Sequence, residues 1–496
     1  MSVTAHLPAL QVVVPMLTAP VLVLLRDARL CWIAALLTSA TSFAIAVALA
    51  AGVLDGMDIR YAMGNWAAPY GIELRVDALS AILLLATTGA STLALLGGRR
   101  SLLREIGDAR LPLFLAAWLL ALAGLVGILV SGDAFNIFVF MEISSLATYI
   151  LVSGGPHRRA LPAVFKYLIT GTVGATFYLI GVGLLYMMTG TLNIEDMAAR
   201  LGDVGASDLL YIAIGFIAIG LALKAAIYPL HAWMPNAYTF APHMVTVFIA
   251  ACSTKVSLYV LLRMDYAVFQ HNLPEQGLHF ALILMPLASL GIVFGSLAAI
   301  FEQNIKRILA LSSVAQLGYI LLGASLVSAA GINASALHLF NHALAKGALF
   351  LAVACLGYRF AKLRLEDLRG AGRLMPWTLT AFALAGLSLI GIPGTAGFVS
   401  KWALILALME QGALGVALVV LVVVSSLMAV VYIGRIVETL WFAEPPGEDP
   451  TVKEAPVMLL AVTWLAVALN FWFGFDASTS GALAIQAATD LTGSAP

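Results

Sequence analysis

The stretch Gly215–Arg263 reads GFIAIGLALKAAIYPLHAWMPNAYTFAPHMVTVFIAACSTKVSLYVLLR. A proline- and aromatic-rich connection joins two apolar runs, and each run carries one lysine, Lys224 or Lys255. A lysine at the centre of a bilayer helix costs about 3 to 10 kcal/mol, so we expect both lysines to serve a function. The alternative, a lysine near a helix end whose ammonium group extends to the interface, applies better to Lys224 than to Lys255.

Pro229 adds a second signal beside Lys224. It has no N–H group, so it cannot donate to the carbonyl of Ala225. Interrupted helices at membrane depth persist only inside protein or against a water-filled cavity. The sequence therefore predicts a broken helix at this point, in the protein interior.

The composition indicates a membrane protein. Of 496 residues, 62% are hydrophobic and 10% are charged, whereas soluble domains carry about 25% charged residues. The formal net charge is zero, so nothing indicates a nucleic-acid partner. Cys31, Cys252 and Cys355 lie singly in apolar runs, which predicts neither a disulfide framework nor a metal site. We expect no cofactor. The first apolar run lacks a basic region and a cleavage site, so we expect it to be retained.

Apolar runs of about 20 residues, long enough to cross a bilayer, recur along the chain. We place about fourteen, at 7–25, 30–53, 77–96, 111–131, 134–152, 160–188, 209–230, 242–264, 278–301, 308–328, 333–356, 374–410, 412–437 and 456–475. The twelfth run is expected to form two half-helices around Pro393. The sequence thus predicts an all-α polytopic membrane protein with broken helices seven and twelve and no soluble domain.

The basic residues predict the orientation. Loops after odd-numbered runs hold 18 of the 26 lysines and arginines, and loops after even-numbered runs hold four. Since basic loops face the cytoplasm, we expect both termini on the outer side of the cell (inner) membrane.

An inverted internal repeat is indicated. The fifth and tenth runs share a Ser-Ser pair, at Ser144 and Ser312, and the seventh and twelfth runs each combine a break with a lysine, Lys224 or Lys401. Matching runs are five apart, an odd number, so the copies cross the membrane in opposite directions, as in many transporters. We divide the single membrane domain 1–496 into 1–110 (helices 1–3), 111–264 (repeat one, helices 4–8), 278–438 (repeat two, helices 9–13) and 456–475 (helix 14).

Glu142 is the one acid that we place deep inside a run, about eight residues or ~12 Å from its start. A lone carboxylate there needs a cation, and Lys224 is the expected partner. The alternative is a protonated glutamic acid that hydrogen-bonds within the bundle.

Three polar residues of the eleventh run, His338, His342 and Lys346, are spaced i, i+4, i+8 and therefore share one helix face. Such a stripe could relay protons between lysines through water, although either histidine could instead bond a neighbouring carbonyl. Lys401 follows the second break and is expected to be an ion site or an interfacial anchor.

A carboxylate beside a lysine gives a way to move protons. An ion pair at ~4 Å and an effective dielectric constant of ~20 is worth about 4 kcal/mol, and separation to ~8 Å halves that energy. Movement within the Glu142–Lys224 pair would therefore change whether Lys224 holds its proton. A freed charge on Lys224 would in turn repel the proton on Lys255.

Four strings carry a family resemblance: YPLHAWMPNAY (228–238), NIKRILALSSVAQLGY (304–319), NHALAKGALFL (341–351) and GIPGTAGFVSKW (391–402). With Glu142 and the lysines they resemble the antiporter-like subunits of Mrp-type cation/proton antiporters, respiratory complex I and membrane-bound energy-converting hydrogenases. The resemblance implies two half-channels that meet at Lys255 through His342 and Lys346, with Glu142–Lys224 as the coupling pair and Lys401 at the end of the path.

The segment around Lys401 looks more like the D-type subunit of Mrp antiporters than complex I, whereas Asn304 resembles a complex I subunit. The resemblance implies a proton-translocating subunit of an Mrp-type Na⁺(K⁺)/H⁺ antiporter, embedded in the lipid bilayer among other membrane subunits. The alternative is the proton-pumping membrane arm of a redox enzyme whose electron carriers lie in other chains. A solitary small-solute transporter fits less well, because the polar groups suit protons.

Overall fold

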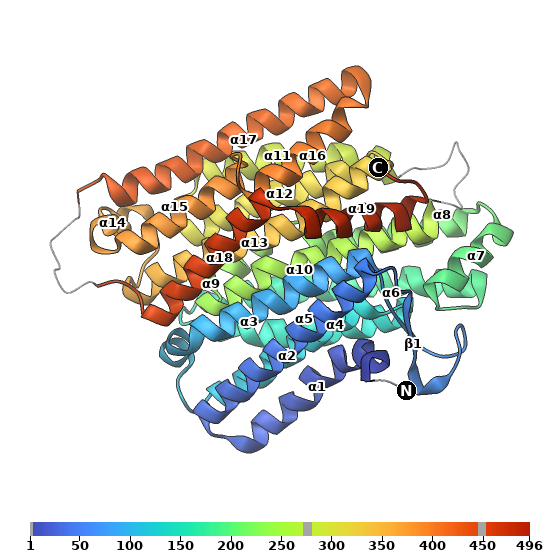
Figure 1. Cartoon of the computed structure of the whole chain (residues 1–496), viewed down its shortest axis with the longest axis horizontal. Coiled ribbons are helices and arrows are strands. Elements are labelled where there is room, and N and C mark those ends of the chain that lie inside the picture. Colours follow the sequence, from blue (N-terminus) through green and yellow to red (C-terminus); the bar gives the residue numbers. More distant parts are fainter. Residues whose placement is uncertain (1–2, 271–279, 445–452) are drawn as a thin grey trace.

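The computed structural model describes residues 3–270, 280–444 and 453–496, and its long helices run roughly parallel (Figure 1). The first half contains α1 (Leu7–Leu25), α2 (Ala28–Leu54), β1 (Ile59–Ala62), β2 (Glu73–Val76), α3 (Ala78–Ile106), α4 (Leu111–Val130), α5 (Ala134–Ser153), α6 (Ala160–Thr189), α7 (Ile194–Val204), α8 (Asp208–Ala225), α9 (Met234–Phe240) and α10 (His243–Arg263). The second half contains α11 (Phe280–Phe301), α12 (Ile305–Ala324), α13 (Ala329–Arg359), α14 (Ala371–Leu374), α15 (Pro376–Ile390), α16 (Ala396–Met409), α17 (Gly412–Trp441), α18 (Val457–Phe475) and α19 (Ser478–Thr492).

The predicted all-α membrane fold is confirmed. Of the described helices, 13 are long and apolar enough to cross a membrane, or 14 if a bent pair that ends in α15 counts as one span. Every predicted run coincides with a helix or a broken helix; residues 278 and 279, where the ninth run was predicted to begin, lie outside the described residues. The repeat boundaries and the absolute orientation stay predictions.

Both predicted helix breaks are present. Helix α15 ends at Ile390 and α16 begins at Ala396. The first break begins earlier than predicted, because α8 ends at Ala225 and Ala226 adopts the left-handed conformation, with φ 56°. Pro229 therefore lies in the connection to α9, not in the helix. The indole N–H of Trp233 donates to the carbonyl of Leu223 at 2.9 Å, in the last turn of α8, where carbonyls lack i+4 partners.

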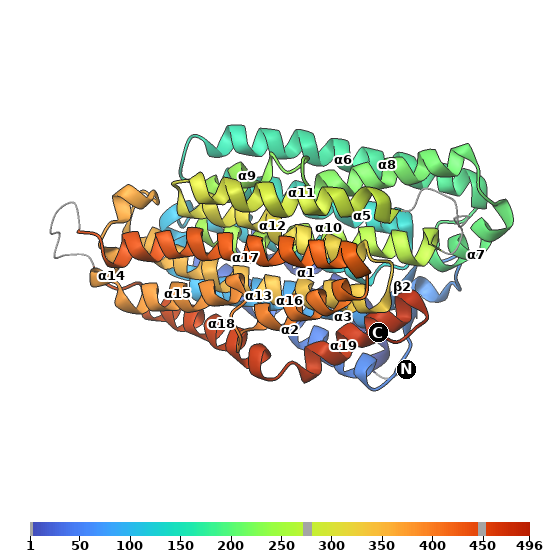
Figure 2. The same ribbon diagram turned by 90° about the horizontal axis from the view of Figure 1, so that it is seen from above.

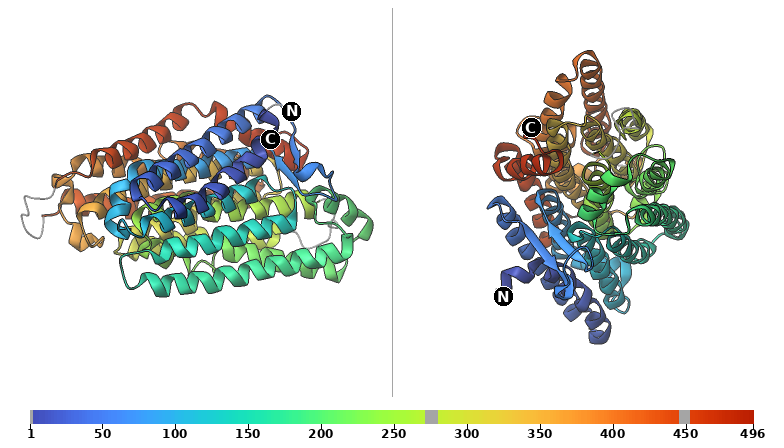
Figure 3. Two further views of the ribbon diagram at one scale, coloured as in Figure 1. Left: turned by 90° about the horizontal axis from the view of Figure 1, so that it is seen from below. Right: turned by 90° about the vertical axis from the view of Figure 1, so that its right-hand side faces the viewer.

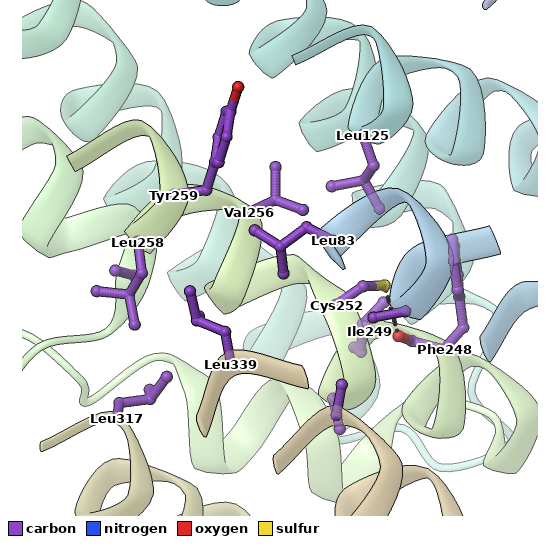
Figure 4. Packing of buried hydrophobic residues seen from close by; sticks show 14 of the residues in the cluster. Leu83, Leu125, Phe248, Ile249, Cys252, Val256, Leu258, Tyr259, Leu317 and Leu339 are labelled. Atoms are coloured by element: carbon purple, nitrogen blue, oxygen red, sulfur yellow. Dashed lines mark hydrogen bonds between the residues drawn. The ribbon is translucent and has the colours of Figure 1, made fainter. Parts of the chain in front are cut away.

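Helix α10 lies at the centre of the bundle. It packs against α3, α8 and α13, and Figure 4 shows its Val256 beside Leu83 of α3. In the end-on view of Figure 3 the other helices surround this core. Lipid is as apolar as these side chains, so close packing rather than exclusion of water holds such helices together.

One end of the bundle carries structure that the hydrophobic pattern did not indicate. Strands β1 and β2 form an antiparallel hairpin, and the short helix α7 lies at the same end (Figures 1 and 2). Arg60 of β1 donates to Glu195 of α7 at 2.6 Å, and this hydrogen bond lowers the pKa of Glu195. The hairpin and α7 are thus joined outside the membrane-spanning helices.

The C-terminal region also differs from expectation. The sequence predicted no helix after 475, but α19 follows α18 and packs along α13 and α3. Its helical pattern is hard to recognise because half of its buried positions are alanines and another is a serine. Both ends of the chain lie at the end of the bundle that carries β1 (Figure 1), as the predicted even number of spans requires.

A close contact between α6 and α8 gives a test of the fold. A Cβ atom at Gly220 would lie 2.5 Å from the carbonyl oxygen of Gly174, whereas Gly215 on the same helix has open space around it. Gly220→Val should force the two helices apart and cost about 1–3 kcal/mol, lowering the Tm of the purified protein. Gly215→Val is the matched control, and an equal loss of Tm in both variants would contradict the close contact.

Candidate functional site

The predicted partners Glu142 and Lys224 lie together inside the bundle. Glu142 comes from α5 and Lys224 from the last turn of α8, and their Oε1 and Nζ atoms are 3.6 Å apart. The ammonium group donates a shorter hydrogen bond, 2.6 Å, to the hydroxyl of Ser145. Within the described residues, Glu142 Oε1 accepts no hydrogen bond. The pair is therefore held by charge more than by a fixed hydrogen bond, which leaves its separation adjustable.

The orientation of Lys224 bears on the interfacial alternative. Its side chain is 6% exposed, and that of Glu142 is 26% exposed. An interfacial anchor would extend its ammonium group toward water, whereas this one turns toward a carboxylate and a hydroxyl of α5. The geometry favours an internal ion pair.

Lys255 is fully buried near the middle of α10. Its ammonium group donates to the backbone carbonyl of Ala250 at 2.7 Å. No acid forms an ion pair with it among the described residues. His342 and Lys346 of α13 are among the side chains that interact electrostatically with Lys255. The two helices thus bring together the groups that the resemblance implies.

The two histidines of α13 differ in their contacts. His338 is held on both sides, with Nδ1 2.8 Å from the Ser400 hydroxyl and Nε2 3.1 Å from Gln316 Oε1. His342 is buried, yet neither ring nitrogen has a hydrogen-bond partner in the described part of the chain. The rings stack with centroids 5.9 Å apart. Buried polar atoms nearly always have hydrogen-bond partners. We therefore expect water to bind the two ring nitrogens of His342.

The remaining lysines are held by neutral oxygen atoms. Lys346 donates to the carbonyl of Leu309 at 2.7 Å and to the hydroxyl of Ser312 at 2.6 Å. Lys401 donates at 2.8 Å to the carbonyl of Ile390, the last residue of α15, and lies 4.9 Å from the ring centre of Tyr319. The second break therefore supplies the acceptor for its own lysine.

Sequence reasoning missed the aromatic side chains between the two lysines of the first repeat. The rings of Tyr149 and Tyr167 lie edge to face, 4.7 Å apart, and the Tyr167 hydroxyl interacts with Ser253. Tyr149 is near Glu142, and Ser253 is two residues from Lys255. These groups join the ion pair to α10. No spacing rule could have found them, because they lie on three different helices.

The chemistry of the side chains at the site can be compared with that of metal ligands. Across residues 3–270, 280–444 and 453–496, no three His, Cys, Asp or Glu side chains are grouped so as to hold a metal ion. The site consists of amines, imidazoles, hydroxyls and one carboxylate. Such groups exchange protons readily, whereas hard cations need several oxygen ligands.

A protein-family comparison covers the part of the chain that contains this site. Residues 131–429 match the model described as "NADH:quinone oxidoreductase/Mrp antiporter, TM". That region contains all seven predicted site residues: Glu142, Lys224, Lys255, His338, His342, Lys346 and Lys401.

Curated relatives and solved structures agree with that match. The chain is 41% identical to the NADH-quinone oxidoreductase subunit N of Desulforudis audaxviator, over 92% of this chain and 95% of the relative. It is 29% identical to the D-type subunit of the Na⁺/H⁺ antiporter of Alkalihalophilus pseudofirmus, over 86% and 85%. A chain of the Mrp complex from a Dietzia species shares the fold with a TM-score of 0.90 at 27% identity, over 99% and 98%.

The ion pair gives the second prediction. Glu142→Gln removes the charge that faces Lys224 but little volume, so it should lower ion transport at least about tenfold, or 1.4 kcal/mol in activation free energy, while the complex still assembles. Lys224→Ala should act likewise. Transport is measured in proteoliposomes and assembly by size-exclusion chromatography.

An exchange of the two residues, Glu142→Lys with Lys224→Glu, should recover part of the activity if pairing alone matters. Wild-type transport by Glu142→Gln would end the coupling role of the pair.

Proposed function

Because the chain belongs to the NADH:quinone oxidoreductase/Mrp antiporter transmembrane family, we propose that it is the proton-translocating subunit of a multi-subunit Mrp-type Na⁺(K⁺)/H⁺ antiporter. The observation that carries the proposal is the series of titratable side chains inside the bundle, from the half-buried Glu142 to the buried Lys401. The fold likeness to a chain of an Mrp complex over nearly the whole length supports the Mrp assignment.

In this proposal protons move along the membrane centre. Separation of Glu142 from Lys224 makes Lys224 release its proton, because the attraction that stabilised the ammonium group is lost. Tyr167 and water pass the proton toward Lys255. The free nitrogens of His342 then accept and donate on the way to Lys401. Each group changes charge by one unit, and the neutral oxygens around it accept hydrogen bonds from the charged form.

A second candidate function rests on the NADH-quinone oxidoreductase relative, whose identity to this chain is higher than that of the antiporter relative. In that case the same proton path would belong to the membrane arm of a quinone-reducing enzyme, and the driving force would be electron transfer in other subunits. The path within this chain would be unchanged. Only the energy source and the partners differ between the two candidates.

The partners distinguish the two candidates. We propose to purify the chain from its native membrane and to identify the proteins that copurify. Small membrane subunits support the antiporter, and iron–sulfur proteins support the redox enzyme. The purified complex is then placed in proteoliposomes with a pH-sensitive dye inside. A Na⁺ or K⁺ gradient that drives proton movement supports the antiporter, and no proton movement with either gradient overturns it.

Lys255 provides the third prediction. Arginine keeps the positive charge but stays protonated at any accessible pH, so Lys255→Arg cannot release a proton. We expect Lys255→Arg to lower proton translocation nearly as much as Lys255→Ala, at least about tenfold. A purely structural cation predicts the reverse, with an active arginine variant and an unstable alanine variant. Proton flux and complex yield, measured for both variants, separate the two roles.

A further inference from the structure

A cavity of about 680 Å³ lies where α3 ends, α10 and α12 begin and the chain leaves α13. Its outer wall carries basic side chains, among them Arg104, Arg159 and Arg364. It lies among loops that the distribution of basic residues assigns to the cytoplasmic side. Its inner wall contains three titratable side chains that the proposed proton path does not use: Glu105, His243 and Lys306.

The three inner groups form a connected cluster. The Glu105 carboxylate accepts from the Ser101 hydroxyl at 2.7 Å and from the backbone N–H of His243 at 3.0 Å. Lys306 is 3% exposed, shares an electrostatic interaction with Glu105, and donates to the carbonyl of Ala241 at 2.7 Å. The buried His243 Nδ1 has no partner among the described residues. A carboxylate, an imidazole and an amine thus face one cavity.

A glycine of α13 leaves room for the imidazole of this cluster. A Cβ atom at Gly357 would collide with the ring of His243. Only glycine allows α13 to pass this close to the start of α10. The imidazole is therefore held between two helices that also carry Lys255 and Lys346.

Helix α12 joins the cavity to the central lysines. Lys306 lies in its first turn, and the carbonyl of Leu309, three residues or ~4.5 Å further along the axis, accepts from Lys346. Ser312, a further turn on, also accepts from Lys346. The interior end of the cavity is therefore within about two helical turns of the buried amine of α13.

We propose that this cavity is a proton port, in which Glu105, His243 and Lys306 exchange protons between water at the basic face and Lys346. The inference rests on the proposed function. Each step moves one proton from an O–H or N–H group to a lone pair, directly or through water, and needs no other reactant. An anion bound in the cavity is disfavoured, because the Glu105 carboxylate lies on its inner wall.

A removable block of the cavity tests the port. Ala361 is exposed and lines the cavity, so Ala361→Cys allows a bulky, membrane-impermeant methanethiosulfonate reagent to fill it without altering the three inner groups. The native cysteines are all buried and should not react. The matched control is Ala109→Cys, at an exposed position that lines a separate cavity with Arg26 and Asp27.

Labelling of Ala361→Cys, verified by mass spectrometry, should lower proton translocation by the complex in proteoliposomes at least about fivefold. A reducing agent should restore translocation, and labelled Ala109→Cys should keep it. Full translocation by labelled Ala361→Cys, with an active wild type, overturns the port and leaves the proposed function standing. A wild type that moves no protons overturns both.

A pair of substitutions tests the inner groups. Lys306→Met keeps the length of the side chain but removes the exchangeable proton, and should lower translocation at least about fivefold in assembled complex. Arg307→Met, one residue further on, removes a partly exposed cation that binds Glu302 and Asn236 and should leave translocation unchanged. Equal translocation by the two variants would exclude Lys306 from the port.

Discussion

The removal of ammonium groups from bulk water is the constraint on which this structure depends. A charged amine inside a membrane must be surrounded by oxygen atoms of the protein. Lys401 shows how the fold supplies them, because the last carbonyls of α15 are left without helical partners and accept hydrogen bonds from its ammonium group. These carbonyls also lie at the negative end of a helix dipole. The helix break after α15 thus provides the hydrogen-bond acceptors that a buried lysine requires.

The same constraint explains the other lysines. Lys306 donates to the carbonyl of Ala241, between α9 and α10, where the backbone is again interrupted. Lys346 uses the hydroxyl of Ser312 and the carbonyl of Leu309 on a neighbouring helix. Lys224 alone among them combines a hydroxyl with a carboxylate. A neutral oxygen holds a lysine without fixing its charge, whereas the carboxylate makes the charge on Lys224 depend on distance.

The sequence predicted the spans, both breaks and the Glu142–Lys224 contact, because each has a local signal: an apolar run, a proline or glycine, or a charge in an apolar run. It did not predict α19, whose buried face has alanine at half of its positions, nor the hairpin, whose strands are four residues each. Lys306 precedes the tenth predicted run, which was expected to begin at residue 308, yet it lies in α12 and its amine turns inward. Tertiary packing determines whether such a side chain is buried or exposed, and packing cannot be deduced from the local pattern of a single sequence.

In the proposed proton path, four buried lysines (Lys224, Lys255, Lys346 and Lys401) accompany one carboxylate, Glu142, and this imbalance has a consequence for occupancy. Two unit charges ~8 Å apart repel by about 2 kcal/mol at an effective dielectric constant of ~20. If every amine were charged, the interior would hold a large uncompensated charge, so arrival of a proton at one end raises the energy of those already present. The lysines should therefore exchange protons in a coupled way: a proton binds at one end as another is released at the other end. Ions displace one another similarly in a multi-ion pore. The rate of proton translocation would then be limited by proton release from the last lysine of the path and not by proton uptake at the first.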